Sequence, residues 1–376
     1  MPRALITLLF CIALIGANGM ILSPVLTDIA SQFGVSASVV GRAIAAYGLG
    51  TGLTALWLGR SLDNFGIARA LRYAMLVAGL SEALSGFATG WGMLVGLQFM
   101  AGMGAGVALP AIYGITGALS PKGEESRYMA RVLLGWSVSL VAAVPLGAAL
   151  SDIVGWRIML GLVGALCLAL VPMVLTLPVI SLPARTTLKM RRFKPLLLPD
   201  GATLYGICLL FMISFYGLYA YIADYARNAF TLGSTAAGLI ALVYGVGFGM
   251  ASFAAPLIDR LGRQTALRLV LLLAAVLLAL ISVPHSFALM LPLVWLWGAA
   301  NHFILNMIVV GLNALAPQNR GAVMGLYSGT TYIGAAIGAV IMGMLYESFG
   351  FLGPTIAASS MHILAVLLTF TLARKL

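Results

Sequence analysis

The sequence predicts an all-α membrane protein with twelve transmembrane helices, and three observations lead to this fold class. Of the 376 residues, 62% are hydrophobic and only 8% are charged, whereas a soluble protein of this length needs a charged surface. The mean hydropathy is +1.07. Apolar runs of about 20 residues, the length that crosses a bilayer as a helix, recur along the whole chain. A transmembrane barrel is excluded, because its strands would give alternating segments of about 10 residues.

The predicted spans fall into two groups of six. The first group covers residues 4–26, 39–59, 70–89, 92–114, 128–150 and 157–178. The second group covers residues 201–223, 235–256, 265–284, 287–314, 321–345 and 352–373. We therefore predict a six-helix bundle over 1–180, a linker over 181–200 and a second six-helix bundle over 201–376.

Charge bias predicts the orientation of the chain in the membrane. Lysine and arginine accumulate in cytoplasmic loops. With the N-terminus inside, only Arg42, Arg157 and Arg227 of the 21 basic residues fall on the outer side. The basic stretch ARTTLKMRRFKP at 184–195 is then a cytoplasmic linker, or alternatively a lipid-binding or regulatory site. We expect both termini in the cytoplasm, and no nucleic-acid partner, because the net charge of +11 suits contact with anionic lipid.

Patterns typical of enzymes, cofactors or metal sites are not found in the sequence. The three cysteines lie in separate apolar runs without paired spacing, which indicates neither a disulfide framework nor a metal site. No phosphate-binding loop, His/Glu cluster or Ser–His pair occurs. We predict no cofactor, no metal and no enzymatic activity. A membrane scaffold without transport activity is disfavoured, because polar side chains line several of the predicted helices.

Related segments recur in the two halves of the chain. GRSLDNFGIARAL at 59–71 and APLIDRLGRQTAL at 255–267 follow the second and the eighth span, and their aspartates are 196 residues apart. DIVGWR at 152–157 and YESFGF at 346–351 follow the fifth and the eleventh span. Two homologous halves joined by a cytoplasmic loop explain this pattern, and parallel repeats of this kind are a recurrent transporter design.

With these motifs the chain resembles the major facilitator superfamily, and most closely its twelve-span drug:proton antiporter branch. The first cytoplasmic signature of the superfamily matches at Gly59, Asp63 and Gly66, while Asn64, Ile67 and Ala68 replace basic positions and Arg69 substitutes in part. The second copy keeps Asp259, Arg260, Gly262 and Arg263 but has Ala255 for the first glycine. The fifth span, AAVPLGAALSDIVGWR, is similar to the antiporter signature of that helix, with Pro145, Gly147, Gly155, Trp156 and Arg157.

These motifs suit a conformational gate. Glycine permits a tight turn between spans, and an aspartate near a helix end can accept backbone hydrogen bonds or pair with an arginine. Contacts made in only one state set the balance between inward- and outward-facing forms. Pro145 removes a backbone hydrogen bond and is expected to kink the fifth span, next to Gly147. The alternative is that Asp63 and Asp259 only anchor the topology.

Polar side chains inside the spans are candidates for a substrate site. In the resembling superfamily, helices 1, 2, 4, 5, 7, 8, 10 and 11 line the central cavity, which implies that these groups face one pocket. Aromatic rings with a few amides and one imidazole suit a small, moderately polar or amphipathic organic ligand. The alternative for each residue is helix–helix hydrogen bonding or ring packing. The candidates are Asn18, Tyr47, Gln98, Tyr216, Tyr219, His302, Asn306 and Tyr332.

Two of these candidates depart from the antiporter pattern. Gln98 stands four residues before Gly102, where related antiporters carry an arginine, and Asn18 is neutral where many cation exporters have an acid. The resemblance therefore implies a neutral or anionic substrate more than a lipophilic cation.

Proton coupling needs a group that changes its protonation state, and two residues qualify. His302 is the histidine placed near mid-membrane on a predicted cavity helix. Glu82 is the carboxylate well inside a span, but the resemblance puts the third helix at the outside of the bundle. There we expect Glu82 to be protonated or paired with Ser81 or Ser85. Both residues stay candidates, and uncoupled transport stays open.

Together these observations predict a secondary active transporter of the inner membrane, working as a monomer by alternating access. The expected activity is proton-coupled efflux of a small organic molecule. The alternative is an importer or an uncoupled facilitator of a sugar, nucleoside, organic acid or other metabolite.

Overall fold

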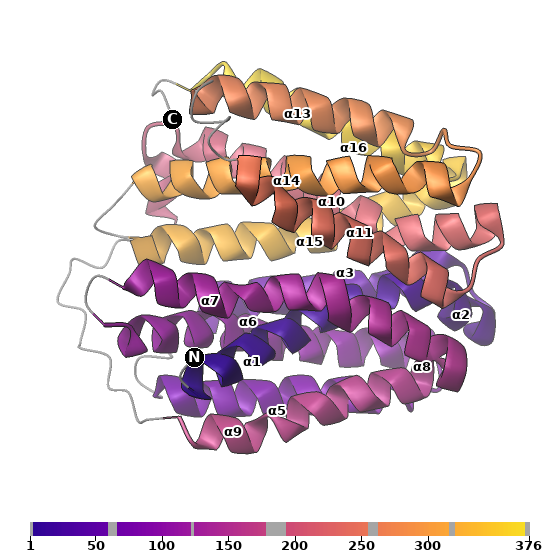
Figure 1. The fold of residues 1–376 in the computed structure, drawn as a ribbon, viewed down its shortest axis with the longest axis horizontal. Helices are drawn as coiled ribbons and strands as arrows, with labels where there is room; N and C mark the ends of the chain where they lie inside the picture. The colour runs from indigo at the N-terminus through magenta and orange to yellow at the C-terminus, as the bar shows by residue number, and fades with distance from the viewer. Residues whose placement is uncertain are drawn as a thin grey trace.

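The computed structural model describes residues 3–58, 66–121, 124–177, 193–254, 262–315 and 320–372. Every regular element in these ranges is a helix. The long helices run side by side along the longest axis of the molecule, and both ends of the chain lie at the same end of that axis (Figure 1). The opposite end carries the short helix α2 (Leu22–Phe33), and we call it the α2 end.

The two halves of the chain form two pseudo-symmetric groups of helices. The N-terminal helices are α1 (Arg3–Met20), α2, α3 (Ala37–Leu58), α5 (Ile67–Ser85), α6 (Trp91–Leu119), α7 (Glu125–Val138), α8 (Val144–Ala169) and α9 (Val171–Leu175). The C-terminal helices are α10 (Gly201–Phe230), α11 (Ser234–Met250), α13 (Arg263–Leu280), α14 (Phe287–Leu315), α15 (Arg320–Phe349) and α16 (Leu352–Thr369). Short 3₁₀ turns occupy Lys194–Leu197 and Ala251–Ala254.

The expected first span over 4–26 is two helices, α1 and α2, separated at Ile21. Pro24 explains the break, because proline has no N–H to donate to the carbonyl of Met20 four residues earlier. Helix α2 then ends at Gly34, which adopts a left-handed conformation with φ 63°. The break changes the direction of the chain before α2, which packs against α10 and α11 of the second half.

The fifth span also contains a local irregularity. A π-helical turn over Ser139–Ala143 joins α7 to α8, and Pro145 stands in the first turn of α8. Pro145 has no backbone N–H to donate. The wider π turn before it provides hydrogen bonds for the backbone groups on its N-terminal side. At the α2 end, Gly155 interrupts α8 with φ 83° and ψ 155°. The chain reverses there and runs back as the rest of α8 (Figure 1).

In the described part of the chain, nine helical segments are long and apolar enough to cross a membrane. One of them, Arg127–Leu175, has 49 residues and contains the reversal at Gly155. Gln264–Leu280 in α13 is apolar but shorter, and α5 falls outside this set with Arg69, Arg72 and Glu82 among its 19 residues. The number twelve stays a prediction.

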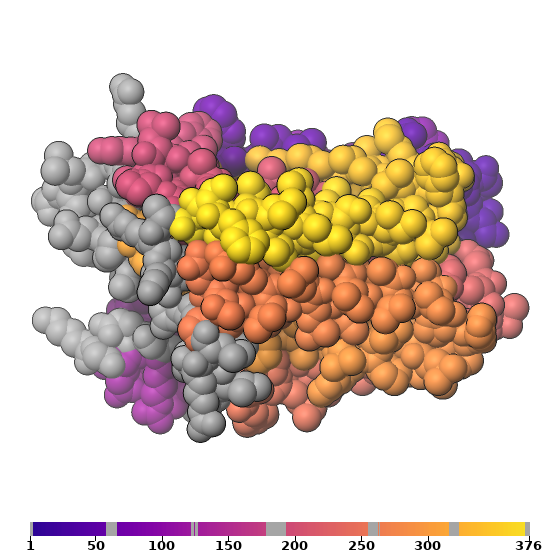
Figure 2. Space-filling view, turned by 90° about the horizontal axis from the view of Figure 1, so that it is seen from above, coloured from indigo at the N-terminus to yellow at the C-terminus, as the bar shows by residue number. Residues whose placement is uncertain are grey.

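Apolar side chains cover the outer faces of the helices. In Figure 2, α13 and α16 run next to each other along one side of the molecule. Leu269, Leu273 and Val276 of α13 and Leu364 and Leu367 of α16 are exposed. Such a surface is unfavourable in water and favourable against lipid, so the fold is that of a multi-pass membrane protein.

The internal repeat expected from the sequence is visible in the backbone. Gly66 and Gly262 stand directly before α5 and α13 with φ 87° and φ 75°, and they are 196 residues apart. A positive φ is readily available only to glycine. Ser23 of the first half bonds to Tyr219 of the second, also 196 residues away. The two halves therefore meet along equivalent segments, α2 and the C-terminal part of α10.

Candidate functional site

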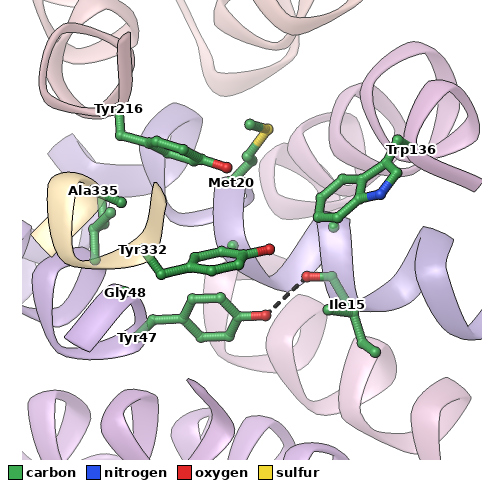
Figure 3. A pocket seen from close by; sticks show the side chains of 11 residues that line it. Ile15, Met20, Tyr47, Gly48, Trp136, Tyr216, Tyr332 and Ala335 are labelled. Carbon is green, nitrogen blue, oxygen red and sulfur yellow. Dashed lines mark hydrogen bonds between the residues drawn. The ribbon is translucent and has the colours of Figure 1, made fainter. Parts of the chain in front are cut away.

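A small pocket lies where the two halves face each other. Five helices contribute its walls: α1, α3 and α7 from the first half, and α10 and α15 from the second. Figure 3 shows aromatic rings from both halves around one space. The lining residues are Ile15, Gly16, Gly19, Met20, Ile44, Tyr47, Gly48, Trp136, Tyr216, Tyr332 and Ala335.

Three tyrosines supply the polar groups of this pocket. The hydroxyl of Tyr47 donates to the carbonyl oxygen of Ile15 at 2.9 Å, which fixes its ring against α1. The rings of Tyr216 and Tyr332 lie 6.4 Å apart between centroids. Their hydroxyls form no hydrogen bond with the described residues and point towards the space beside Trp136 (Figure 3). Two phenol groups are therefore available to a ligand as donors and acceptors.

Glycines allow the pocket walls to approach each other. A Cβ at Gly48 would lie 3.0 Å from the carbonyl oxygen of Tyr332 and 3.1 Å from the amide nitrogen of Ala336. The backbones of α3 and α15 therefore touch across the two halves. A Cβ at Gly16 would lie 2.9 Å from the ring of Trp136, so the indole packs directly on α1.

The chemistry of the lining is apolar and aromatic without charge. No Asp, Glu, Lys, Arg or His occurs among the described residues that line the pocket. A charged ligand would lose its hydration here without gaining a counter-ion, which costs several kcal/mol. The arrangement suits an uncharged ligand with a flat face and a few polar groups at its edge. The described residues also contain no group of three His, Cys, Asp or Glu able to hold a metal ion.

The structure brings together three of the eight expected substrate residues, Tyr47, Tyr216 and Tyr332, on the pocket wall. Tyr219 is buried one turn further along α10, where its ring packs against Phe215. Asn18 points into the N-terminal helices, and its amide lies 3.9 Å from the sulfur of Cys167. Neither Tyr219 nor Asn18 lines the pocket.

Two further expected substrate residues, His302 and Asn306, lie four residues apart on α14 and do not line the pocket. His302 is half-buried between the rings of Phe248 and Phe303, and Asn306 is exposed. The neighbouring Asn301 is the buried amide, and it donates to the hydroxyl of Tyr244 at 3.0 Å. A spacing of i, i+4 identifies one helix face but does not say which face is turned inward.

Glu82 is buried among the N-terminal helices. It is 0% exposed, and its Oε2 accepts a hydrogen bond from Nε2 of Gln98 at 2.9 Å. The expected partner was a neighbouring serine on the same helix. The observed partner comes from α6, because α5 packs against α6 along its length and turns this face inward. Gln98 is therefore also directed to Glu82 and away from the pocket.

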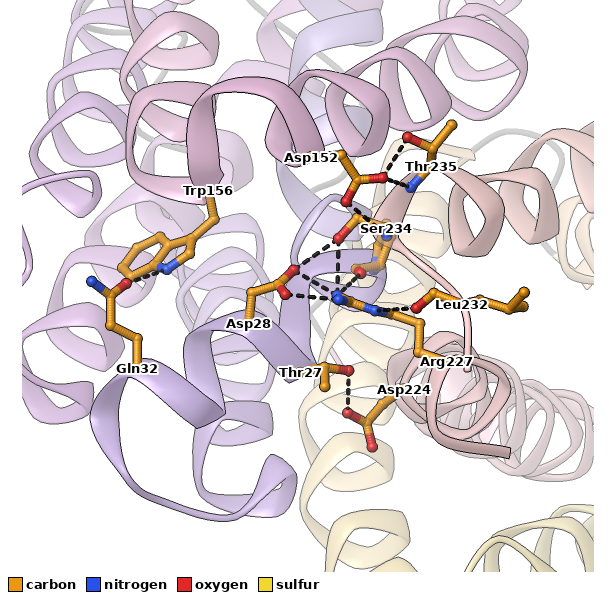
Figure 4. A network of polar contacts seen from close by, with 11 residues as sticks. Thr27, Asp28, Gln32, Asp152, Trp156, Asp224, Arg227, Leu232, Ser234 and Thr235 are labelled. Carbon is orange, nitrogen blue, oxygen red and sulfur yellow. Dashed lines mark hydrogen bonds and ion pairs between the residues drawn. The ribbon is translucent and has the colours of Figure 1, made fainter. Parts of the chain in front are cut away.

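A polar network joins the two halves at the α2 end (Figure 4). Nη1 and Nη2 of Arg227 on α10 bond to the two carboxylate oxygens of Asp28 on α2, at 2.5 and 2.7 Å. The hydroxyl of Ser234 donates to Asp28 at 2.8 Å. Such a two-pronged contact fixes both the distance and the orientation of its partners. We call the set Asp28, Arg227 and Ser234 the latch.

Further contacts surround the latch. Asp152 of α8 accepts the backbone N–H of Ser234 at 2.9 Å and that of Thr235 at 2.6 Å. A carboxylate at the N-terminus of a helix is favoured by free N–H groups and by the helix dipole, and here it ties α8 to α11. Thr27 donates to Asp224 of α10 at 2.6 Å. The α2 end is therefore closed by hydrogen bonds between the halves.

The superfamily profile decides the assignment of the chain. The profile of the Major Facilitator Superfamily matches residues 8–314 and, in a second match, residues 204–375. The chain belongs to the Major Facilitator Superfamily.

Relatives of this Major Facilitator Superfamily member are named as transporters. It is 25% identical over 368 residues to an uncharacterized MFS-type transporter, YwfA, of Bacillus subtilis, with 96% of this chain and 89% of the relative covered. It is 27% identical over 343 residues to a probable sugar efflux transporter of Pasteurella multocida, with 86% and 81% covered. The protein is therefore a membrane transporter of small molecules and not an enzyme.

A solved structure shares the fold. The crystal structure of a bacterial homologue of the human lysosomal transporter Spinster, in an inward-facing and unoccupied conformation, matches with a TM-score of 0.82. The sequence identity is 15%, and 99% of this chain and 98% of that chain are covered. The agreement extends over both halves of the superfamily fold.

The superfamily motifs lie partly outside the described residues. Gly59, Asp63, Asp259 and Arg260 belong to the ranges that the structure leaves undescribed. Gly66 and Gly262 precede α5 and α13, Arg69 lies in the first turn of α5, and α13 begins at Arg263. Their role as a gate stays a prediction.

Pro145 and Gly147 lie where α8 meets other helices. A Cβ at Gly238 of α11 would lie 3.3 Å from the Cα of Pro145, so the proline stands at the contact between the halves. Gly147 lies against the side chain of Ile21 at the break between α1 and α2. Pro145 therefore packs on α11 of the second half, and Gly147 packs on the break between α1 and α2.

The sequence did not indicate the latch, nor most of the residues that line the pocket. Asp28, Asp152 and Arg227 occur near predicted span ends, where charges are common, and no spacing relates residues 199 positions apart. Trp136 and Met20 are ordinary apolar residues in a predicted span. The pairing of α1 with α7 and of α2 with α10 is needed to identify them.

Proposed function

We propose that the protein exports a small uncharged organic molecule across the bacterial inner membrane in exchange for protons. The pocket carries the proposal, because both halves of the chain build it and because α2, which follows the pocket residue Met20, holds Asp28 of the latch. Closing and opening its two ends in turn would expose it to one side at a time.

The pocket lining supports a neutral ring-shaped substrate. Tyr47, Tyr216, Tyr332 and Trp136 offer aromatic faces, and aromatic side chains pack on flat rings or on the C–H faces of sugars. The two unpartnered hydroxyls can bond to hydroxyl or carbonyl groups at the edge of such a ring. The name of the Pasteurella multocida relative, a probable sugar efflux transporter, agrees with this class and with export.

The charge distribution supports a cytoplasmic location of both termini. Arg42, Arg157 and Arg227 lie towards the α2 end: Arg42 stacks on Trp91, Arg157 bonds to the carbonyl oxygen of Ala88, and Arg227 is in the latch. These are the three basic residues that the positive-inside rule assigns to the outer side. The α2 end is then periplasmic, and the latch holds a form closed to the periplasm.

The working unit in this proposal is a monomer of two rocking bodies. Residues 1–180 and 201–376 would each move as one body, with 181–200 as a cytoplasmic linker. Hydrogen bonds at the α2 end would be exchanged for contacts at the other end during each cycle. Glu82 and His302 are the two candidates for the coupling proton.

Purified protein in proteoliposomes tests the function. The panel consists of radiolabelled glucose, arabinose, uridine, lactate and the cation tetraphenylphosphonium, each with and without an imposed proton gradient. We expect accumulation of one neutral ring compound driven by the gradient, and none of the cation. Gradient-independent equilibration of the transported compound would instead identify a facilitator, and selective transport of the cation would contradict the substrate class.

A further inference from the structure

A fully buried polar pair, Glu82–Gln98, lies inside the N-terminal helices. Both side chains are 0% exposed. Nε2 of Gln98 donates to Oε2 of Glu82 at 2.9 Å and to the hydroxyl oxygen of Ser85 at 3.3 Å. Ser85 in turn donates to the carbonyl oxygen of Ser81 at 2.9 Å. The amide is therefore held in one orientation by two partners on α5.

Two oxygen atoms of this pair have no hydrogen-bond partner among the described residues. They are Oε1 of Glu82 and Oε1 of Gln98. A carboxylic acid and a primary amide are complementary, because the amide N–H bonds to one carboxyl oxygen while the acid O–H bonds to the amide oxygen. One proton on Glu82 would give both unpartnered oxygens a bond. An ionised carboxylate would leave both without one.

The surroundings of Glu82 contain no compensating charge. The ion pairs that join two described residues are Arg227–Asp28 and Arg127–Glu124, and neither involves Glu82. The groups that face it are Gln98 from α6, Tyr47 from α3 and Cys167 from α8, besides the serines of its own helix. None is a cation. The desolvation free energy of an ionised Glu82 would therefore not be offset by a neighbouring cation.

The pair lies behind the wall of the pocket. Gly102, one turn from Gln98 on α6, packs against the backbone of Tyr47 on α3, and Tyr47 lines the pocket. Gly79, one turn from Glu82 on α5, packs against Cys167, which is 3.9 Å from the amide of Asn18, and Asn18 is next to the pocket residue Gly19. A shift of α1 or α3 on ligand binding would therefore displace the side chains that separate the pocket from the Glu82–Gln98 pair. His302, by contrast, is half-buried between two phenylalanine rings.

We propose that Glu82 is the proton-binding residue of the transport cycle and that Gln98 is its positioning residue, favouring the neutral acid. The inference rests on the proposed function for its role in coupling. In one state the pair holds the proton as an acid–amide pair. In the other state the pair separates, water reaches the carboxyl group, and the proton leaves to that side, with the carboxylate as the only other product.

Infrared difference spectroscopy of the purified protein tests proton binding without any substrate. We expect the C=O band of a protonated carboxylic acid near neutral pH, lost in Glu82→Gln and retained in Glu124→Gln, whose carboxylate is exposed at the other end. Gln98→Arg should also remove the band, because arginine pairs with the ionised form. A band that persists in Glu82→Gln would overturn the assignment. Gel filtration and thermal unfolding check that each variant is folded.

Transport by the same variants separates this inference from the function. With the compound that the proteoliposome panel identifies, Glu82→Gln should still exchange it across the membrane but lose at least tenfold of its gradient-driven accumulation. Gln98→Arg should behave likewise, and Glu82→Asp should recover part of the accumulation. If Glu82→Gln accumulates normally while His302→Ala does not, the inference fails and the proposed function stands. If the wild type shows no gradient dependence, the proposed function fails, and the infrared result alone decides proton binding.

Discussion

Replacing Arg227 with glutamine should shift the transporter away from the form that is closed at the α2 end. Arg227 is the cation that holds Asp28 across the halves, and it also donates to Ser234 and to the carbonyl oxygen of Pro24. Glutamine keeps part of the length and removes the charge. Asp28 would then keep the hydrogen bond from Ser234 but lose its arginine.

The size of the effect follows from the burial of the pair. The side chain of Arg227 is 10% exposed and that of Asp28 is 36% exposed. Exposed ion pairs contribute about 0–1 kcal/mol, and breaking a buried pair costs about 3–5 kcal/mol. An intermediate value of about 2 kcal/mol corresponds to a change of about 30-fold in the ratio of closed to open forms. Asp28→Asn should have the smaller effect, because Arg227 keeps its bonds to Pro24, Leu232 and Ser234.

Distance distributions between spin labels measure this ratio. Exposed positions for the labels are Ser31 on α2 and Ala229 on α10. We expect a single short distance in the parent protein and a second, longer one in the Arg227→Gln variant. Arg127→Gln is the matched control, since it breaks the exposed pair with Glu124 near the other end.

The reasoning is refuted if Arg227→Gln gives the same distribution as Arg127→Gln. It is also refuted if Asp28→Asn shifts the distribution further than Arg227→Gln, because the isolated carboxylate is then not the costly group. In the variant that carries both Arg227→Gln and Asp28→Asn, the shift should be smaller than the sum of the two single shifts, because both substitutions remove the same interaction.

Three further predictions concern the pocket and the contacts between the halves. Gly41→Ala should destabilise the closed form by about 1–3 kcal/mol, because the added Cβ would meet the hydroxyl of Tyr221. Thermal unfolding should show a lower Tm for this variant but an unchanged Tm for Gly96→Ala, whose added Cβ has open space around it. Tyr332→Phe should raise KM for the transported compound by up to about tenfold with little change in kcat, because one neutral hydrogen bond is lost; an unchanged KM would place the hydroxyl outside the site. Asp152→Ala should shift the label distances in the same direction as Arg227→Gln but by about 1 kcal/mol, because the N-terminus of α11 loses its carboxylate; a shift in the opposite direction would contradict the role of this contact.

The class of the protein could be predicted from the sequence because lipid imposes a simple composition. Long apolar runs, few charges and the repeated motifs around Gly66 and Gly262 are local or periodic features. They survive in any packing of the helices, and both glycines do adopt the backbone conformation that only glycine takes easily. The pocket tyrosines Tyr47, Tyr216 and Tyr332 could also be selected, because they lie on spans that the resemblance assigns to the central cavity.

The sequence by itself thus determined a membrane transporter of two repeated halves, and only the tertiary structure decided which side chains meet. The direction of Glu82 depends on how α5 is rotated against α6, and a single residue of helix rotation, about 100°, separates the buried Asn301 from the half-buried His302. The latch joins residues almost 200 positions apart. Such contacts follow from the way two six-helix groups close on each other, which leaves no periodic signal in either helix.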